Sequence, residues 1–416
     1  MKSFDADVIV AGAGLAGATF ALAAAHGGLR VVLVDPLPFS AQLEPTFDGR
    51  ASAIAYSSFR QWRVLGVGEH LTEVAQPIRR ILVTDGKRPG AASGKGLGAY
   101  LRFDAEEIAD RSEGEPLGWM IENRQARVGL SRALEASSVE LRTPVGLRSL
   151  SGDGFDVTAE LSDGTSVSAP LIVGAEGRAS VVRDWAGIGV VGWPYPRSGV
   201  VATVRLEQDH GGVAHEVFLP DGALAILPLT EQRASLVWTE PHDRARALKT
   251  ASLPAFNAHL KRRFGEFLGH VEALEPRFVY PLGLQLAETL AGPRAALLGD
   301  AGHAIHPLAG QGLNLGLKDA AALAETLVEA RRLGEDIGSA PVLERYDRWR
   351  RFDNLAMSAM TDGFDRLFAT DNPLVRLVRD TGMAAVNRLE PARRFFMQEA
   401  GGAVGDLPRL LRGEAL

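Results

Sequence analysis

One segment of the sequence brings together a carboxylate, two histidines and closely spaced glycines. It runs GDAGHAIHPLAGQGLNLGLKD from Gly299 to Asp319, after a short apolar run. Asp300, at the end of a predicted strand, would accept hydrogen bonds from ligand hydroxyls. Glycines at 310, 312 and 316 would let a flat ligand approach the backbone. A helical pattern from about residue 315 to 331 would turn its positive end toward an anionic group, so the segment predicts a ligand-binding turn.

The N-terminus carries a second motif for ligand binding. Residues 7–10 (DVIV) are typical of a buried strand, and Gly12, Gly14 and Gly17 follow as GxGxxG before an alanine-rich helical stretch. A second predicted strand, residues 29–34, ends at Asp35, where a carboxylate can bind a ribose hydroxyl. In this strand–helix–strand context the motif predicts dinucleotide binding, but it does not choose between NAD and FAD.

The segment at Gly299 makes that choice. A flavin nucleotide carries a ribityl chain and a ring system beyond its pyrophosphate and needs a second binding turn, whereas NAD does not. A third segment, LIVGAEGRASVVR from Leu171 to Arg183, again has the pattern of a strand, a glycine turn and a polar loop, here around Glu176. Together the three motifs predict FAD as the cofactor.

In order and spacing, these motifs resemble those of the single-component, class A FAD-dependent aromatic monooxygenases. Within that family, the strings HPLAGQGLNLGLKD (306–319) and DGRASAI (48–54) look like those of the ubiquinone-biosynthesis ring hydroxylases. The resemblance covers roughly residues 5–400. One position departs from the family pattern, because Glu176 stands where the family usually has Asp, and we expect its hydrogen bonds to differ.

The resemblance implies an α/β fold of the p-hydroxybenzoate-hydroxylase type, with a Rossmann-like FAD-binding domain interleaved with an antiparallel β-sheet substrate domain. We expect the FAD-binding domain in residues 1–73, 104–186 and 276–340, the substrate domain in 74–103 and 187–275, and C-terminal helices in 341–416. Strand patterns at 200–206, 215–219, 223–227 and 234–238 predict the antiparallel sheet. Phe218, Leu227 and Trp238 lie on these strands and are candidates to line an apolar pocket, or to be plain core.

The resemblance also implies a reaction. We expect an FAD-dependent monooxygenase that hydroxylates the aromatic ring of a polyprenylated ubiquinone precursor with dioxygen, via a C4a-hydroperoxyflavin. The chain has one GxGxxG, so NAD(P)H would bind only transiently as electron donor. Two alternatives stay open: a flavin-dependent reductase or dehydrogenase of a prenyl lipid, and a non-catalytic flavin-binding scaffold that assembles with other quinone-biosynthesis proteins.

The resemblance assigns roles to further residues. Arg50 and Arg124 would reach the cofactor, with an interdomain ion pair and a solvated helix start as the respective alternatives. Backbone groups of Gly310, Gly312, Leu313 and Asn314 would bind the flavin at the helix N-terminus.

Two neighbouring residues are candidates for catalysis. His306 could relay a proton from a phenolic substrate, or could hydrogen-bond the backbone and shape the loop. Pro307 would fix the loop beside the flavin. For His303 we expect a structural role.

Composition narrows the class of protein. The formal charge is −6 and no Lys/Arg-rich run appears, which argues against nucleic-acid binding. The sequence has no cysteine and no plausible metal-ligand cluster, so we expect no metal site and no disulfide. We expect a cytoplasmic protein. The tail from Asn372 is partly apolar and partly basic. Two roles stay open for it: docking on the protein's own core, or peripheral contact with the inner face of the membrane.

Overall fold

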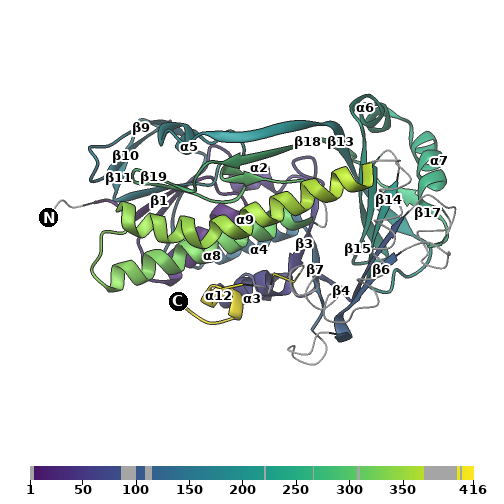
Figure 1. The fold of residues 1–416 in the computed structure, drawn as a ribbon, viewed down its shortest axis with the longest axis horizontal. Helices are drawn as coiled ribbons and strands as arrows, with labels where there is room; N and C mark the ends of the chain where they lie inside the picture. Colours follow the sequence, from purple (N-terminus) through teal and green to yellow (C-terminus); the bar gives the residue numbers. More distant parts are fainter. Residues whose placement is uncertain are drawn as a thin grey trace.

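The computed structural model describes residues 4–85, 100–107, 115–219, 222–265, 267–306, 310–369, 401–402 and 405–416. Figure 1 shows an elongated molecule, with a helix-covered sheet near the N-terminus at one end and a larger sheet at the other. Two long strands, β13 (Val190–Leu206) and β18 (Phe278–Ala287), run between the two ends. Pro307 and the tail from Asn372 to residue 400 lie outside the described residues.

The cofactor sheet has the strand order β19-β20-β12-β1-β2-β8. Its strands are β1 (Val8–Ala11), β2 (Val31–Val34), β8 (Glu140–Arg142), β12 (Leu171–Gly174), β19 (Ala291–Gly292) and β20 (Ala295–Leu297). All pairs are parallel except β19 with β20. The strands β1, β2 and β12 are buried along their whole length, which is why they are continuous apolar runs without alternation.

Helices cover this sheet and position the loops at its carboxyl edge. The helix α1 (Leu15–His26) packs against α8 (Gln311–Arg332), and α9 (Ala340–Ala369) packs on α8 and continues to the larger sheet. The other α-helices of this part are α2 (Phe39–Gln42), α3 (Tyr56–Val64), α4 (Asn123–Glu135), α5 (Val181–Trp185) and α12 (Arg409–Arg412). The short 3₁₀ segments are η1 (Gly68–Leu71), η3 (Ala105–Glu107) and η4 (Gly299–Ala301).

The larger sheet has nine strands in the described residues, in the order β21-β18-β13-β16-β15-β14-β5-β6, with β17 beside β13. The strands not yet given are β5 (Arg80–Asp85), β6 (Tyr100–Asp104), β14 (Val213–Leu219), β15 (Gly222–Leu229), β16 (Arg233–Pro241), β17 (Val271–Ala273) and β21 (His303–Ala304). The pairing is antiparallel as predicted, except that β5 and β14 run parallel. That pair joins two segments far apart in the sequence, so no local turn could have indicated its direction.

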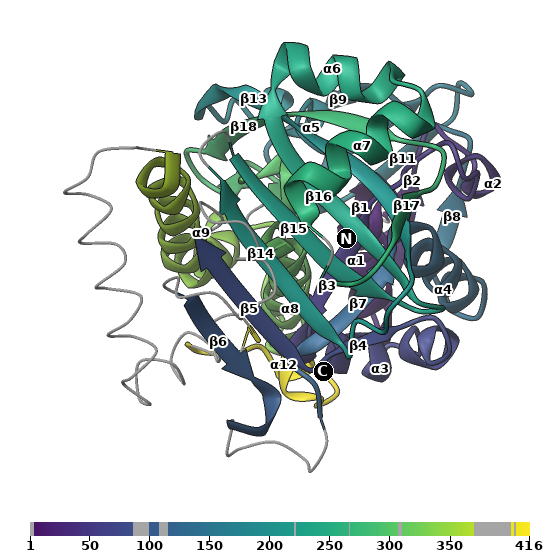
Figure 2. The same ribbon diagram turned by 90° about the vertical axis from the view of Figure 1, so that its right-hand side faces the viewer.

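The helices α6 (His242–Thr250) and α7 (Leu253–Phe264) cover one face of this sheet, and Figure 2 shows them in front of it. Residues such as Val217, Leu224 and Leu236 form an apolar core with these helices. Trp238 belongs to that core and packs edge-to-face on Phe256. Its candidate role in a substrate pocket is therefore wrong, because strand alternation turns it toward the helices.

Two smaller sheets have the orders β11-β10-β9 and β3-β7-β4. Their strands are β3 (Ala51–Ala55), β4 (Gln76–Ile78), β7 (Gly118–Glu122), β9 (Leu147–Ser151), β10 (Val157–Leu161) and β11 (Ser166–Ala169). The strand β13 begins ten residues before the predicted start at residue 200. Its register with β18 shifts between Pro194 and Ser198, where prolines cannot donate to the ladder, and this hid the strand in the sequence.

The division into domains stays a prediction. The predicted FAD-binding range 276–340 contains β20 of the cofactor sheet, and it also contains β18 and β21 of the nine-stranded sheet. The chain thus changes sheets within that range.

Candidate functional site

The three glycines of the GxGxxG loop are needed for three different reasons. Gly12 has φ +99°, and a Cβ there would lie 2.5 Å from the carbonyl oxygen of Ala175. A Cβ on Gly17 would lie 2.0 Å from the Gly12 carbonyl oxygen. A Cβ on Gly14 would meet no described protein atom within 4 Å. Gly12 and Gly17 therefore serve the fold, whereas Gly14 leaves space beside the N-terminus of α1, where a pyrophosphate would bind.

Asp35 holds this loop at the end of β2. Its Oδ2 accepts a hydrogen bond of 2.7 Å from the Ala13 N–H, and its Oδ1 accepts one of 2.8 Å from the Leu37 N–H. Each carboxylate oxygen has a further lone pair. The side chain is thus fixed by the backbone, and its contact with a ribose hydroxyl stays a prediction.

The Gly-Asp turn leaves Asp300 exposed at the edge of the cofactor sheet. Gly299 has φ +58°, and its N–H donates to Asp319 Oδ2 over 3.1 Å. A Cβ on Gly316 would lie 3.1 Å from the Gly299 Cα, so α8 packs directly on the turn. This close contact is a structural reason for glycine at position 316, where the sequence had indicated only close approach of a ligand.

The N-terminus of α8 supplies backbone donors beside the turn. Gly310 is its N-cap residue in the left-handed conformation (φ 63°) and offers no side-chain cap. The first four N–H groups, counted from the N-cap, have no partner within a helix, and here these include the N–H groups of Gly312 and Leu313. The Asn314 side chain is not free for a cofactor, because it accepts from the Ala55 N–H (2.9 Å) and donates to the Ala53 carbonyl (2.7 Å).

Below the turn lies a buried charge network. The Asp319 carboxylate contacts His303 Nε2 and accepts a 2.9 Å hydrogen bond from Arg350 Nε and a longer one from Asn354. Burial by itself would raise the pKa of Asp319, but His303 and Arg350 outweigh it and hold the pKa well below its usual range. The network fixes the turn to both α8 and α9. The contribution of Arg350 was not predicted, because it stands far from every motif.

A second cluster surrounds the buried Asp48. Its carboxylate accepts hydrogen bonds from Arg50 (2.8 and 3.0 Å), Asn123 (3.0 Å), Arg127 (2.8 Å) and the Tyr280 hydroxyl (3.3 Å). Burial opposes ionisation, yet these donors lower the pKa of Asp48. The Arg50 guanidinium is half exposed and lies over the Tyr280 ring, with 5.0 Å from its Cζ to the ring centroid. Arg50 thus forms an ion pair within this cluster, and its contact with the cofactor stays a prediction.

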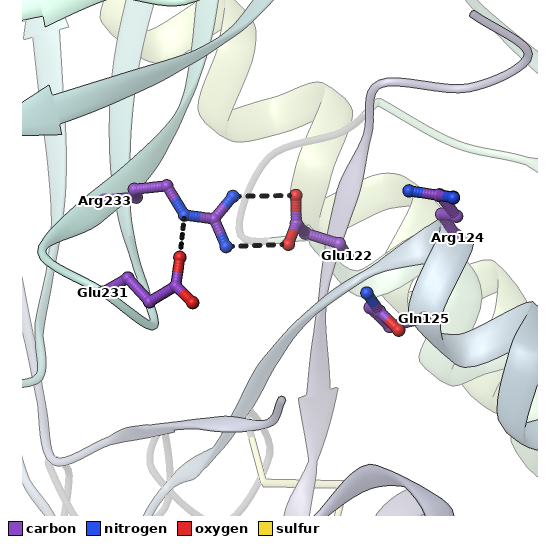
Figure 3. Close-up of a pocket in the computed structure, with 5 residues that line it drawn as sticks. All are labelled: Glu122, Arg124, Gln125, Glu231 and Arg233. Atoms are coloured by element: carbon purple, nitrogen blue, oxygen red, sulfur yellow. Dashed lines mark hydrogen bonds and ion pairs between the residues drawn. The ribbon is translucent and has the colours of Figure 1, made fainter. Parts of the chain in front are cut away.

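Arg124 lies at the rim of a cavity of about 370 Å³ between the start of α4 and the turn joining β15 to β16 (Figure 3). Its Nε donates to the Leu43 carbonyl over 2.6 Å. Across the cavity Arg233 forms a double hydrogen bond with Glu122, and its Nε lies 3.6 Å from Glu231. Because this lining is charged and polar, the cavity does not suit a lipophilic substrate.

Glu176 caps α5. Its Oε1 accepts a 3.0 Å hydrogen bond from the Val182 N–H, and its Oε2 accepts a 2.6 Å hydrogen bond from the Ser180 hydroxyl. Burial raises the pKa of this carboxyl despite these donors. The departure from the family's Asp thus has a local structural use, since the longer side chain reaches the first turn of α5.

His306 is buried at the end of the Gly-Asp loop. Its ring lies edge-on to Tyr195, with 5.1 Å between centroids, and the Tyr195 hydroxyl donates to Asp362 Oδ1 on α9 over 2.7 Å. The histidine therefore lies where the loop, β13 and α9 meet. No group of three or more potential metal ligands occurs among the described residues.

The geometry agrees with comparisons to known proteins. A family described as "FAD binding domain" matches residues 5–355. The chain is 43% identical over 415 residues to the ubiquinone hydroxylase UbiL of Rhodospirillum rubrum, covering 99% of this chain and 94% of that protein. It is 35% identical to the 3-demethoxyubiquinol 3-hydroxylase of Escherichia coli, over 97% and 100% of the two chains. The chain belongs to the FAD-dependent monooxygenases of the ubiquinone-biosynthesis hydroxylase family. The predicted family and enzyme class are thereby confirmed.

Other members and structures extend this result. The human mitochondrial ubiquinone biosynthesis monooxygenase COQ6 is 32% identical over 94% of this chain and 91% of its own length. The crystal structure of the p-nitrophenol 4-monooxygenase PnpA of Pseudomonas putida superimposes with a TM-score of 0.78 at 20% identity, over 96% and 98% of the two chains. This likeness confirms the predicted fold class. Among the described residues, no helix is both long and apolar enough to cross a membrane.

Proposed function

We propose that this monooxygenase uses FAD and dioxygen to hydroxylate the aromatic ring of a polyprenylated ubiquinone precursor. The observation that carries the proposal is the identity of 43% and 35%, over nearly the whole chain, to two hydroxylases whose names specify ubiquinone or its precursor. The loops at the carboxyl edge of the cofactor sheet supply the frame for a dinucleotide that this reaction needs.

The residues present fit FAD. Space at Gly14 and the N-terminus of α1 suit the pyrophosphate, Asp35 the ribose, and the exposed Asp300 the ribityl hydroxyls. The backbone N–H groups at the start of α8 suit the electron-rich edge of the ring system. When bound, the flavin supplies the activation of dioxygen. The protein's own part is to bind the two ligands, exclude water and orient the ring.

The proposal also covers the electron donor, the proton relay, the membrane and the partner proteins. NAD(P)H would donate electrons from a transient surface site, because the chain has a single dinucleotide motif. A proton relay through His306 stays a prediction, because this histidine is buried where the Gly-Asp loop meets β13 and α9. Peripheral membrane contact and partner proteins of quinone biosynthesis would suit a lipophilic substrate.

The test is oxygen consumption by the purified FAD-loaded protein with NAD(P)H and a short-chain prenylated phenol. We expect one dioxygen consumed for each hydroxylated product found by mass spectrometry. A prenyl-lipid reductase would give reduced substrate without coupled oxygen uptake, and a scaffold would give no substrate-dependent flavin reduction. Either result would overturn the proposal.

A further inference from the structure

The nine-stranded sheet has a second face, opposite α6 and α7, which we call the inner face. Alternate residues of β5, β6, β14 and β15 point to it, and they form two apolar clusters. These clusters include Val83, Leu101, Ala214, Phe218, Ala223 and Leu227. Figure 2 shows α9 beside β5 and β14, and its residue Leu367 packs in one of the clusters.

One carboxylate interrupts this apolar surface. Glu216 lies on β14 between Ala214 and Phe218, and its pairing partners are Val83 on β5 and Ala225 on β15. Among the described residues, no group donates a hydrogen bond to its carboxyl or forms an ion pair with it. A carboxylate on an apolar face loses part of its hydration without gaining a partner, so its charged form is disfavoured there unless a ligand interacts with it.

The neighbourhood of Glu216 explains its ionisation. The side chains of Ile81 and Val83 on β5, and of Ala223 and Ala225 on β15, are apolar. Asp362 is the one charged side chain that the structure describes between residues 356 and 369 of α9. Its carboxylate accepts a hydrogen bond from the Tyr195 hydroxyl. Arg80, His215 and Arg102 alternate to the opposite face. Glu216 is partly accessible to water, yet burial raises its pKa to about 7.

The inner face adjoins the proposed flavin site. Gly310, the N-cap of α8, lies against Ala53, since a Cβ added to it would come within 3.4 Å of the Ala53 Cβ. Ala53 belongs to the same apolar cluster as Ala214 and Leu227. Glu216 is the next residue of β14 on that face after Ala214, about 7 Å further along the strand. A ring held between the start of α8 and this face would therefore lie on the side of the sheet to which the carboxylate points.

We propose that Glu216 is a catalytic residue that accepts the phenolic proton of the substrate, an inference that rests on the proposed function. The phenolic O–H bond breaks, the proton forms a bond with a carboxylate oxygen, and the electron pair stays on the phenolate. That pair makes the ring carbons ortho and para to the oxygen more electron-rich, which favours their hydroxylation. His306 is nearly inaccessible and packs against Tyr195, so Glu216 is the better placed of the two to meet the ring.

The experiment compares the wild-type protein, Glu216→Gln, His306→Gln and the control Glu272→Gln, an exposed residue of β17 in the same sheet. A prenylated phenol is the substrate, and product per bound flavin is measured across pH. We expect Glu216→Gln to keep its FAD and to lose about 10²-fold in rate. The wild-type rate should rise with pH through about 7, as Glu216 ionises, and the variant should lack this limb. Glu272→Gln should match the wild type.

A binding measurement separates catalysis from packing. With a nitrophenol as probe, which is acidic enough to transfer its proton to this carboxylate, we expect a phenolate difference spectrum on the oxidised wild-type protein and a much weaker one on Glu216→Gln, with an affinity changed only a few-fold. An unchanged rate, pH profile and phenolate signal in Glu216→Gln would overturn the inference. Loss of the pH limb in His306→Gln alone would assign the role to His306 instead.

Two results distinguish this inference from the proposed function. If the wild-type protein hydroxylates no phenol, the proposed function fails, whatever Glu216 does. If Glu216→Gln does not retain FAD, the pH dependence of the phenolate signal decides. A step that shifts in pH in Glu216→Asp, which keeps a carboxyl group, supports Glu216, and a step that does not shift overturns its role.

Discussion

Carboxylates at the two ends of this molecule have pKa values that are shifted in opposite directions. At the cofactor end, Asp48 and Asp319 each accept several hydrogen bonds, and the donors hold both pKa values well below the usual range. On the inner face of the nine-stranded sheet, the strand neighbours of Glu216 among the described residues are apolar, and burial raises its pKa to about 7. The first kind of carboxylate fixes loops, whereas the second is available for proton transfer at neutral pH.

The largest effect should follow from Asp319→Ala. The substitution leaves Arg350 buried without its main partner, so we expect the free energy of unfolding to fall by about 3–5 kcal/mol in urea titrations. Because the folded pKa of Asp319 is lowered, this stabilisation is present at neutral pH and is lost as pH falls through that folded value. Glu335→Ala, which breaks the exposed pair with Arg345, is the control and should change little. Equal losses in the two variants would contradict the view that Asp319 fixes the turn.

A pair of glycine substitutions tests which parts of the cofactor loop serve the fold. Gly17→Ala places a Cβ 2.0 Å from the Gly12 carbonyl, and we expect a loss of stability of about 3 kcal/mol even without FAD. Gly14→Ala meets no described atom within 4 Å, so the apoprotein should unfold at the wild-type temperature while its FAD affinity falls. Calorimetry and flavin titration on apoprotein measure the two quantities. If Gly14→Ala binds FAD with wild-type affinity, the pyrophosphate does not bind in the space beside Gly14.

Asp300→Ala should weaken FAD binding without unfolding the protein. The exposed carboxylate would lose charged hydrogen bonds to ribityl hydroxyls, worth about 1.5–3 kcal/mol, or roughly 10- to 150-fold in dissociation constant. Flavin retained after extensive dialysis is the measurement. Full occupancy in the variant would show that the turn binds something else.

Glu216→Gln should make the protein more stable at high pH. Folding raises the pKa of Glu216 from 4.5 to about 7, so the folded state binds more protons than the unfolded state between these values. Wild-type stability therefore falls as pH rises through that window, whereas the glutamine variant has no proton to lose. We expect equal stability near pH 4 and a gain of about 1–2 kcal/mol for the variant at pH 8, reduced from the full shift because the group is partly accessible. Identical pH dependence would mean that Glu216 is solvated or paired.

Glu176→Asp should have the smallest effect. The shorter side chain cannot reach both the Val182 N–H and the Ser180 hydroxyl, so we expect a loss of about 1 kcal/mol, typical of a helix N-cap. Thermal unfolding measures it, with Glu160→Asp on the exposed surface of β10 as control. A gain in both stability and FAD affinity would show instead that Asp is the better residue at this position.

The motifs could be predicted from the sequence because each is a local backbone requirement. Gly12, Gly14, Asp35 and Asp300 all stand at the ends of apolar strands, and the structure places them at one edge of the cofactor sheet. Other assignments concern side chains whose use depends on distant partners. The Asn314 amide binds β3 and the Glu176 carboxylate caps α5, which neither motif had indicated, and the contacts of both residues with the cofactor stay predictions.

The sequence by itself determined the loops that would bind the cofactor. The conformation of a turn and the conformational freedom of a glycine depend on only a few neighbouring residues. Only the tertiary structure decided the substrate side. The parallel pairing of β5 with β14 joins segments more than 100 residues apart, and it surrounds Glu216 with apolar neighbours. A carboxylate's pKa depends on what lies around it in space, and spacing along the chain does not contain that information.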